Sequence, residues 1–294
     1  MSEMRKSNKD KSCKSKKKHP SGESSIKEPF FSLYREALME LFFPLNVYCH
    51  ICKGPLPKTA PTSAAAYQAY LCPFCIDEIP WIEEPYCKKC SIPLFEHLTE
   101  HTPYPEEILR PLPRPKDLCP ECRADSPLDR NLSVCLYEKP LKKAIYAFKY
   151  SDKTYLARIF ALMMAEKLRT LPREDQAFDR ILSVPLHKKR LRRRGYNQAD
   201  LLAKYLSTEL KIPYDPGGLI RIKETRTMNQ LSKSQRSPNV RDAFSLSKSF
   251  PKTEKILLID DIYTTGATAK AIAACLKSHG TRHITMLSIA RVML

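Results

Sequence analysis

The sequence predicts an α/β protein with a mostly parallel sheet flanked by helices, preceded by a small cysteine-rich domain. Three observations lead to this fold class. Strand-like and helix-like patterns alternate from residue 131 to the C-terminus, and strands separated by helices usually form a parallel sheet. Eight of the eleven cysteines fall in four Cys-x-x-Cys pairs between residues 49 and 122. An apolar run, 256–259, leads directly into two carboxylates and a turn of small residues around a glycine.

The length and composition allow two domains and favour anionic partners. The chain has 294 residues, of which 43% are hydrophobic, and a formal net charge of +18. Such a charge points to phosphorylated metabolites or nucleic acid, although solubility alone is an alternative explanation. No segment has the length and apolarity of a membrane span, and the lysine-rich start lacks the apolar stretch of a secretory signal. We therefore expect a cytoplasmic protein without a membrane span, in a reducing compartment where paired cysteines usually bind metal.

The N-terminal region divides into two segments. Residues 1–28 are rich in lysine and serine and have almost no apolar content, so we expect a disordered basic tail. In residues 29–47, apolar side chains from Phe30 to Phe42 recur at the spacing of an amphipathic helix. Packing onto the following domain is the simplest role for this helix, and docking to a partner or a membrane surface is the alternative.

The cysteine-rich region, residues 48–130, contains an internal repeat. Cys49–Leu56 matches Cys87–Leu94 in sequence, and Leu71–Cys75 matches Leu118–Cys122. This order indicates two copies of one small module. Zn²⁺ prefers four ligands in a tetrahedron, and two cysteines separated by two residues can place both sulfurs on one tight turn.

Two structural zinc sites are therefore predicted, each closed by two neighbouring cysteine pairs. The ligands are Cys49, Cys52, Cys72 and Cys75 in the first site and Cys87, Cys90, Cys119 and Cys122 in the second. Interleaved pairing, a single site with leftover thiols, and redox-active disulfides are the alternatives. A histidine could also replace a cysteine ligand, the candidates being His50, His97 and His101. The region has few large apolar residues, so zinc would supply on the order of 10 kcal/mol of folding free energy per site.

Residues 131–294 are predicted to form the second domain, a sheet whose ligands would bind beyond the carboxyl ends of its strands. Strands are expected at 132–137, 180–186, 219–222, 255–259 and 283–291. Helices are expected at 141–149, 155–168, 198–210 and 268–278.

The most informative segment is Ile256–Thr268, where a buried strand is followed by a sharp turn and the start of a helix. The N-terminus of a helix presents backbone N–H groups and a positive dipole end to a phosphate. We therefore expect a phosphate-binding turn made by Thr264, Thr265, Gly266, Ala267 and Thr268. Asp260 and Asp261 lie beside it and could accept hydrogen bonds from the hydroxyls of an attached sugar. An ordinary strand-to-helix turn without a ligand is the alternative.

This segment resembles the phosphoribosyl-pyrophosphate signature of type I phosphoribosyltransferases. Tyr263 is the one departure, since a plain aliphatic residue is more usual at that position. The resemblance implies a phosphoribosyltransferase-like domain that binds a phosphorylated ribose. It also implies that Asp260 and Asp261 are catalytic, because they would stabilise the positive charge that develops on the sugar as pyrophosphate leaves. In an active enzyme, Mg²⁺ would accompany phosphoribosyl pyrophosphate and be held mainly by oxygens of the ligand.

A second group of candidate residues follows the strand predicted at 180–186 and is strongly basic. We expect a loop at the same end of the sheet as Asp260, where it would suit pyrophosphate or a nucleic-acid backbone. The residues are His187, Lys188, Lys189, Arg190, Arg193, Arg194 and Gly195. A solvated loop without a ligand is the alternative.

A third group lies in a long polar segment without periodicity, which is typical of a mobile lid over a site. The candidate lid residues are Arg226, Gln230, Arg236 and Asn239. A surface connection without a role is the alternative.

The chain is similar to the ComF family of competence proteins. The resemblance rests on the four cysteine pairs, on Pro185-Leu-His with Arg194-Gly-Tyr-Asn-Gln, on Arg236-x-x-Asn239-Val-Arg-x-Ala-Phe and on the acidic motif. It implies a double zinc ribbon joined to a phosphoribosyltransferase-like domain. It also implies a role in the uptake of transforming DNA, together with a helicase-like partner on the incoming single strand. The long, proline-rich spacer between Cys90 and Cys119 departs from the family pattern, which leaves the geometry of the second ribbon open.

Three functions stay open from the sequence. The first is an accessory factor for DNA uptake that binds single-stranded DNA and a phosphorylated ribose. The second is an active phosphoribosyltransferase on an unknown acceptor, because no group of residues identifies a purine, a pyrimidine or an amine. The third is a structural adaptor that has lost its ligand, which the presence of both carboxylates and the glycine disfavours.

Overall fold

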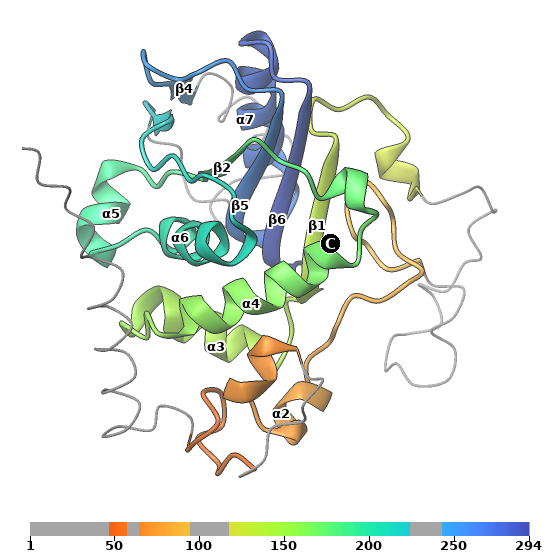
Figure 1. Cartoon of the computed structure of the whole chain (residues 1–294), viewed down its shortest axis with the longest axis vertical. Coiled ribbons are helices and arrows are strands. Elements are labelled where there is room, and N and C mark those ends of the chain that lie inside the picture. The colour runs from red at the N-terminus through yellow and green to blue at the C-terminus, as the bar shows by residue number, and fades with distance from the viewer. Residues whose placement is uncertain (1–46, 58–64, 95–117, 224–242, 294) are drawn as a thin grey trace, which may run out of the picture. The chain divides into compact units, whose positions relative to one another are not determined.

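The computed structural model of the chain describes residues 47–57, 65–94, 118–223 and 243–293 (Figure 1). All of them belong to the second of two compact units, Asn46–Leu294. The basic tail, the amphipathic helix up to residue 46, and the four candidate lid residues lie outside the described residues. Across the described ranges, no helix combines the length and apolarity that crossing a bilayer requires.

A four-stranded sheet with strand order β1-β6-β5-β2 forms the centre of this unit (Figure 1). Its strands are β1 Arg130–Leu136, β2 Arg180–Ser183, β5 Lys255–Tyr263 and β6 His283–Arg291. Every pairing among these four strands is parallel, which confirms the predicted sheet. β5 lies between β6 and β2, so its carboxyl end has a neighbouring strand on each side.

Helices cover both faces of the sheet. They are α3 Leu141–Tyr150, α4 Leu156–Arg169, α6 Gln198–Leu210 and α7 Ala267–Ser278. A further helix, α5 Lys188–Arg194, has no buried residue. Side chains alternate along β5: Leu257 and Ile259 pack with α3, α4 and α6, whereas Ile256 and Leu258 pack with α7. Both faces of the strand are buried, which explains its uninterrupted apolar run in the sequence.

A separate antiparallel sheet of two strands lies on the α7 side. β3 Leu219–Arg221 pairs with β4 Phe244–Leu246. Leu219 and Leu246 pack in the same apolar cluster as the buried side chains of α7. The strand expected at 219–222 therefore forms but does not join the main sheet, and its partner β4 is not predicted from the sequence.

The segment between β2 and α6 differs from the expectation. β2 ends at Ser183 instead of residue 186, because Pro185 has no N–H to continue the ladder. The basic stretch predicted as a loop instead forms helix α5, so that prediction is wrong. Arginine and lysine are good helix formers, His187 accepts a hydrogen bond from the Lys189 N–H, and Gly195 ends the helix at φ 80°.

The cysteine-rich region packs against the sheet domain within the same unit. It contains helix α2 Pro73–Asp77 and short 3-10 helices at Ala66–Tyr70 and Pro120–Cys122. In the sheet domain, a further 3-10 helix, Arg173–Asp175, follows α4. Ile79 and Ile82 share a buried cluster with Met163 of α4. The core is thus continuous across residue 130, and the domain boundary expected there stays a prediction.

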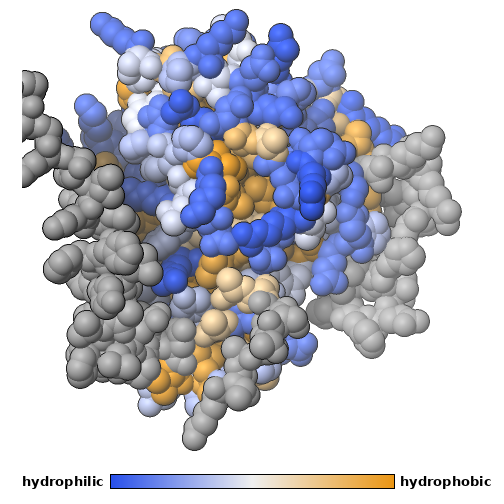
Figure 2. Space-filling view, in the orientation of Figure 1, coloured by the Kyte–Doolittle hydropathy of each residue, from blue (hydrophilic) through white to orange (hydrophobic). Residues whose placement is uncertain are grey.

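The outer side of this region is partly apolar. Figure 2 shows a largely hydrophilic face on which apolar residues gather in patches, some of them at the lower end where α2 lies. Phe74 of α2 and Val47 are 69% and 45% exposed, respectively. Scattered exposed apolar residues are normal on protein surfaces, so they do not by themselves identify an interface.

Candidate functional site

The turn between β5 and α7 has the geometry of a helix start that can bind an anion. Gly266 precedes α7 with φ 74° and ψ 3°, in the left-handed region. A Cβ atom at this position would lie 2.2 Å from the Tyr263 Oη, so both the backbone angle and the space require glycine. The first N–H groups of a helix have no partner within the helix and point toward an incoming anion. The predicted phosphate-binding residues 264–268 therefore span this turn and the first two residues of α7, where the Ala267 N–H donates a hydrogen bond of 3.4 Å to Thr265 Oγ1.

The two carboxylates lie inside β5, near its carboxyl end, rather than after the strand as the sequence pattern indicates. Asp261 Oδ2 lies 2.9 Å from Lys149 Nζ, and the two side chains are 11% and 16% exposed. The Asp261 N–H donates a hydrogen bond of 2.8 Å to Asp260 Oδ1. Asp261 is therefore positioned by a lysine from the last turn of α3, while Asp260 is partly exposed.

Asp260 has an unusual protonation equilibrium for a carboxyl group. Desolvation by the surrounding protein raises its pKa to about 7, and the negative charge of Asp261 contributes in the same direction. The Asp261 N–H and the charges of Lys149 and Arg221 oppose the shift. Near neutral pH the pair therefore carries between one and two negative charges, and a cation or a positively charged sugar would favour the second.

An arginine approaches Asp260 from another element. Burial lowers the pKa of Arg221 at the end of β3, the charge of Arg190 lowers it further, and the charge of Asp260 raises it. Arg190 belongs to α5, so the basic helix lies within electrostatic range of Arg221, which in turn interacts with Asp260. An anionic group next to Asp260 would meet the Arg221 guanidinium here.

The other residues of α5 point in different directions. Lys188, Lys189 and Arg193 are exposed to solvent. Arg194 is partly buried and donates hydrogen bonds of 2.9 Å to Gln198 Oε1 and to Tyr150 Oη. The basic group is therefore divided between the partly buried Arg190 and Arg194 and an outer, solvated set.

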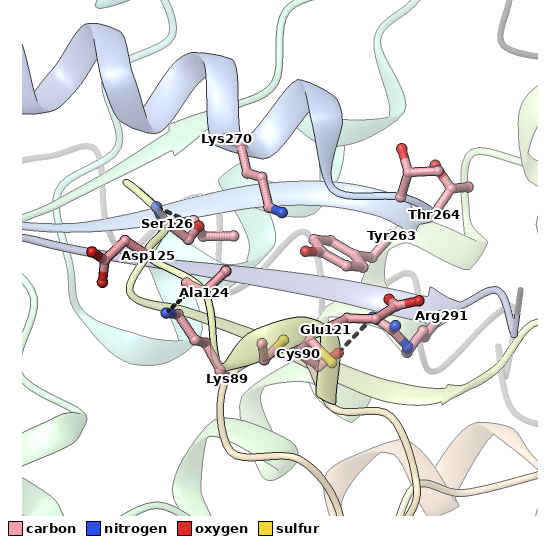
Figure 3. A pocket seen from close by; sticks show the side chains of 13 residues that line it. Lys89, Cys90, Glu121, Ala124, Asp125, Ser126, Tyr263, Thr264, Lys270 and Arg291 are labelled. Atoms are coloured by element: carbon pink, nitrogen blue, oxygen red, sulfur yellow. Dashed lines mark hydrogen bonds between the residues drawn. The ribbon is translucent and has the colours of Figure 1, made fainter. Parts of the chain in front are cut away.

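A small cavity of about 70 Å³ lies between the β5–α7 turn and the second group of cysteines (Figure 3). Thr264, Thr265 and Lys270 line it on one side, and Lys89 and Cys122 are among the lining residues from the cysteine-rich region. Neither carboxylate of the acidic pair contributes to its wall. The cavity is thus separate from the acidic pair and joins the turn to the cysteine-rich region.

Arg291 connects the same two parts of the molecule. It is buried, its Nη1 donates a hydrogen bond of 2.7 Å to the Cys90 carbonyl, and its guanidinium lies 5.2 Å from the centre of the Tyr263 ring (Figure 3). Burial raises the pKa of Tyr263 to about 12, so its hydroxyl stays neutral. The aromatic residue that departs from the usual signature therefore fills the space beside Gly266 and carries a cation–π contact toward the second group of cysteines.

The paired cysteines gather into two groups of four, in the sequential pairing that the repeat predicts. Within each group all four sulfurs lie within 4.8 Å of one another. The Cys52–Cys72 sulfur distance is 3.6 Å and the Cys90–Cys119 distance is 3.7 Å. A tetrahedral site with Zn–S bonds of about 2.3 Å requires sulfur–sulfur distances of about 3.8 Å. Both groups therefore fit structural zinc, and the interleaved pairing is excluded.

The spacer between Cys90 and Cys119 does not disturb the second group. Asn131 of β1 anchors this group, because its Nδ2 donates to the Cys90 carbonyl at 3.1 Å and its N–H to the Lys89 carbonyl at 2.8 Å. His50 is outside the first group and packs instead against Tyr70, with ring centroids 5.6 Å apart. The other two candidate histidines, His97 and His101, lie outside the described residues.

Comparison with known proteins identifies the family. Competence protein F of Haemophilus influenzae is 32% identical over 213 residues, which cover 70% of this chain and 85% of that protein. The chain belongs to the ComF family of competence proteins. DNA utilization protein YhgH of Escherichia coli K12 is 31% identical over 195 residues, covering 60% of this ComF chain and 86% of that protein. Competence protein ComFC of Streptococcus pneumoniae is 27% identical over 159 residues, covering 54% and 67%.

The cysteine-rich region of the ComF chain also matches a domain family by itself. Residues 38–109 match the double zinc ribbon domain. Together with the two groups of sulfurs, this match supports structural zinc, and the ribbon followed by a parallel sheet between helices is the fold class that the sequence predicts.

Solved structures with a similar arrangement are phosphoribosyltransferases. A glutamine phosphoribosylpyrophosphate amidotransferase from B. subtilis is 18% identical, with a TM-score of 0.32, covering 53% of the ComF chain and 31% of that chain. Adenine phosphoribosyltransferase of Leishmania tarentolae is 16% identical, with a TM-score of 0.27, covering 48% and 74%.

Sequence reasoning misses three charged residues of this ComF site. Lys149, Arg221 and Lys270 are single basic residues in a helix or strand, outside any motif. No local signal distinguishes them from surface lysines and arginines, because their role depends on which element the tertiary fold places beside them.

The pKa of Asp260 predicts how the stability of the ComF chain depends on pH. A carboxyl group has an ordinary pKa near 4, so between pH 4 and pH 7 the folded state keeps a proton that the unfolded state releases. The stability that Asp260 contributes is therefore present below that range and is lost as pH rises toward 7. We expect Asp260→Asn, which stays neutral, to gain about 1–2 kcal/mol relative to wild type between about pH 5 and about pH 8 in urea unfolding.

The matched control for this measurement is Asp77→Asn, an exposed position on α2. Its free energy of unfolding should follow that of wild type at both pH values. A difference between Asp260→Asn and wild type that stays constant with pH would contradict the raised pKa.

Proposed function

We propose that this chain is a cytoplasmic ComF-like protein that supports DNA uptake in natural transformation. In this proposal it binds phosphoribosyl pyrophosphate, or a similar phosphorylated ribose, at the end of β5, and it also binds single-stranded DNA. A helicase-like competence partner, implied by the family, would act with it on the incoming strand.

The observation that carries the ligand proposal is the close succession of the acidic pair, the left-handed Gly266 and the start of α7. The ribose 5-phosphate would lie on the N–H groups of residues 264–268. Asp260 and Asp261 would accept hydrogen bonds from the 2- and 3-hydroxyls of the ribose. Thr264, Thr265 and Thr268 offer hydroxyl groups to the same phosphate.

The arginines near Asp260 support a ligand with a second anionic group. Arg221 lies in electrostatic range of the Asp260 carboxylate, and Arg190, from a different element, lies in electrostatic range of Arg221. The pyrophosphate of phosphoribosyl pyrophosphate would neutralise this positive charge. Mg²⁺ held by the pyrophosphate oxygens would reduce the repulsion between the ligand and the carboxylates of Asp260 and Asp261. The candidate lid residues at 226–239 would close over the ligand in this proposal.

The charge of the chain supports the DNA part of the proposal. The formal net charge is +18, and Lys188, Lys189 and Arg193 are exposed on α5. Cationic side chains bind the phosphate backbone with an affinity that falls steeply with salt.

An active phosphoribosyltransferase is the second candidate function, and the intact acidic pair favours it over an adaptor without a ligand. In that reaction the bond between the sugar C1 and pyrophosphate breaks, and pyrophosphate leaves with the electron pair. An acceptor atom forms the new bond to C1 and gives up a proton. The two carboxylates would stabilise the positive charge on the sugar between these events.

A screen for both binding and turnover tests the two functions. Purified protein with phosphoribosyl pyrophosphate and Mg²⁺ is mixed with a panel of purine, pyrimidine and amine acceptors. Calorimetry reports binding, and a coupled assay reports pyrophosphate. Under the accessory function we expect binding without acceptor-dependent release, whereas release with one acceptor would establish the transferase. Absence of binding would contradict both.

A further inference from the structure

Helix α3 presents two exposed tyrosines on its outer face. Tyr146 and Tyr150 are 59% and 52% exposed. They are four residues apart, so they lie on one side of the helix, and their ring centroids are 4.8 Å apart at an angle of 45°. The inner face of α3, with Ile145 and Phe148, is fully buried. Packing within the described residues therefore does not account for these two aromatic rings.

A cation fixes one of the two rings. The guanidinium of Arg194 lies 4.8 Å from the centre of the Tyr150 ring, and its Nη2 donates a hydrogen bond of 2.9 Å to Tyr150 Oη. The Arg194 Nη1 is held by Gln198 Oε1. The arginine is thus oriented from the start of α6, and Tyr150 is held against it. A side chain that is already ordered loses less conformational entropy when a ligand stacks on it.

The charge around the tyrosines is positive. α3 contains three lysines and no acidic residue. Lys142 and Lys143 are exposed on the same helix, whereas Lys149 is occupied by Asp261. Asp152 is exposed and follows the end of α3. Exposed aromatic rings between cationic side chains match a single-stranded nucleic acid, whose bases stack and whose phosphates are anionic.

Helix α3, which presents the tyrosines, also contacts the acidic strand end. Lys149, adjacent to Tyr150 in sequence but on another side of the helix, contacts Asp261 at 2.9 Å. A nucleotide stacked on Tyr150 would therefore be bound by the same helix that supports the proposed sugar site.

We infer that Tyr146 and Tyr150, together with Arg194, form a stacking platform for single-stranded DNA. This inference rests on the proposed DNA binding and assigns it to a surface. Bases stack on the two rings, and phosphates contact Lys142, Lys143 and the exposed side chains of α5. Double-stranded DNA keeps its base faces inside the helix, so the platform selects single strands.

The test measures the affinity of the whole protein for a fluorescent single strand of about 12 nucleotides by anisotropy over a range of salt concentrations. We expect Tyr146→Ala/Tyr150→Ala to weaken binding about 10-fold or more, without changing the slope of log affinity against log salt. Tyr146→Phe/Tyr150→Phe should keep most of the wild-type affinity, because phenylalanine retains the ring on which a base stacks. Lys188→Gln/Lys189→Gln should instead make the fall of log affinity with log salt less steep, because this variant removes two positive charges.

Tyr205→Ala is the matched control, since Tyr205 is an exposed tyrosine on a different helix, α6. It should bind like wild type. Unchanged binding by the Tyr146→Ala/Tyr150→Ala variant would overturn the platform and leave the proposed function in place. Equal affinity of wild type for a duplex of the same sequence would also overturn it. Absence of any single-strand binding by wild type would overturn the DNA part of the proposed function itself.

Discussion

Phosphoribosyl pyrophosphate with Mg²⁺ is expected to raise the melting temperature of the wild-type protein, and Asp260→Asn/Asp261→Asn is expected to abolish the rise. A ligand that binds only the folded state at about 100 times its dissociation constant adds about 2.7 kcal/mol of stability. For a protein of this size that corresponds to a shift of roughly 5–10 °C. The double variant loses both negative charges, and one oxygen of each side chain becomes an NH2 donor, so it binds the ribose hydroxyls and the developing positive charge less well. Differential scanning fluorimetry with and without ligand measures both shifts.

The matched control removes the same two charges elsewhere. Asp77→Asn/Glu78→Gln changes neighbouring exposed acids on and next to α2, and its ligand-dependent shift should equal that of wild type. The absolute melting temperature of the Asp260/Asp261 variant is not the criterion, because Lys149 loses its partner there. A wild-type protein whose melting temperature does not respond to the ligand would refute an intact sugar site.

The purified protein is expected to contain two zinc ions per chain, and their removal by a strong chelator is expected to unfold the cysteine-rich region. Structural zinc contributes on the order of 10 kcal/mol per site, which is comparable with the whole net stability of a typical domain. Burial raises the pKa of the Cys75 and Cys122 thiols, so zinc binding also releases protons and weakens at low pH. Mass spectrometry of the metal content and circular dichroism during chelation measure the two effects.

Single cysteine variants sharpen this prediction. Cys52→Ser and Cys119→Ser each remove one ligand from a different group and should each lower the content to one zinc ion. Cys275→Ser is the control, since this partly buried cysteine lies on α7 outside both groups, and it should keep two. Retention of both ions by Cys119→Ser would contradict the second site.

Much of the fold is predictable because its signals are local. The structure has β6 and α6 at the residues that the sequence predicts, His283–Arg291 and Gln198–Leu210. A long apolar run such as β6 rarely forms anything other than a buried strand. The N-cap of α6 is Asn197, whose side chain accepts a hydrogen bond from the Ala199 N–H. The cysteine groups are predictable for a similar reason, since an internal repeat and fixed spacing leave sequential pairing as the simplest arrangement.

The remaining features depend on tertiary contacts that no local pattern encodes. α5 lies in a basic run whose composition is also typical of a solvated loop, and β4 is too short to show an alternation of apolar and polar residues. The pairing of Lys149 with Asp261 joins positions more than a hundred residues apart. The motif therefore predicts the acidic pair and the turn, whereas the cations around them appear only when the elements are packed.

The position of the Tyr263 hydroxyl beside Gly266 constrains how relatives of this chain can diverge. An alanine at 266 would collide with the tyrosine ring and would also be strained at a φ of 74°, so a small residue at 263 removes only one of the two obstacles. A small residue at 263 would in turn leave Arg291 without its aromatic neighbour. Positions 263 and 291 should therefore change together over evolutionary time, whereas the glycine should be kept whichever residue stands at 263.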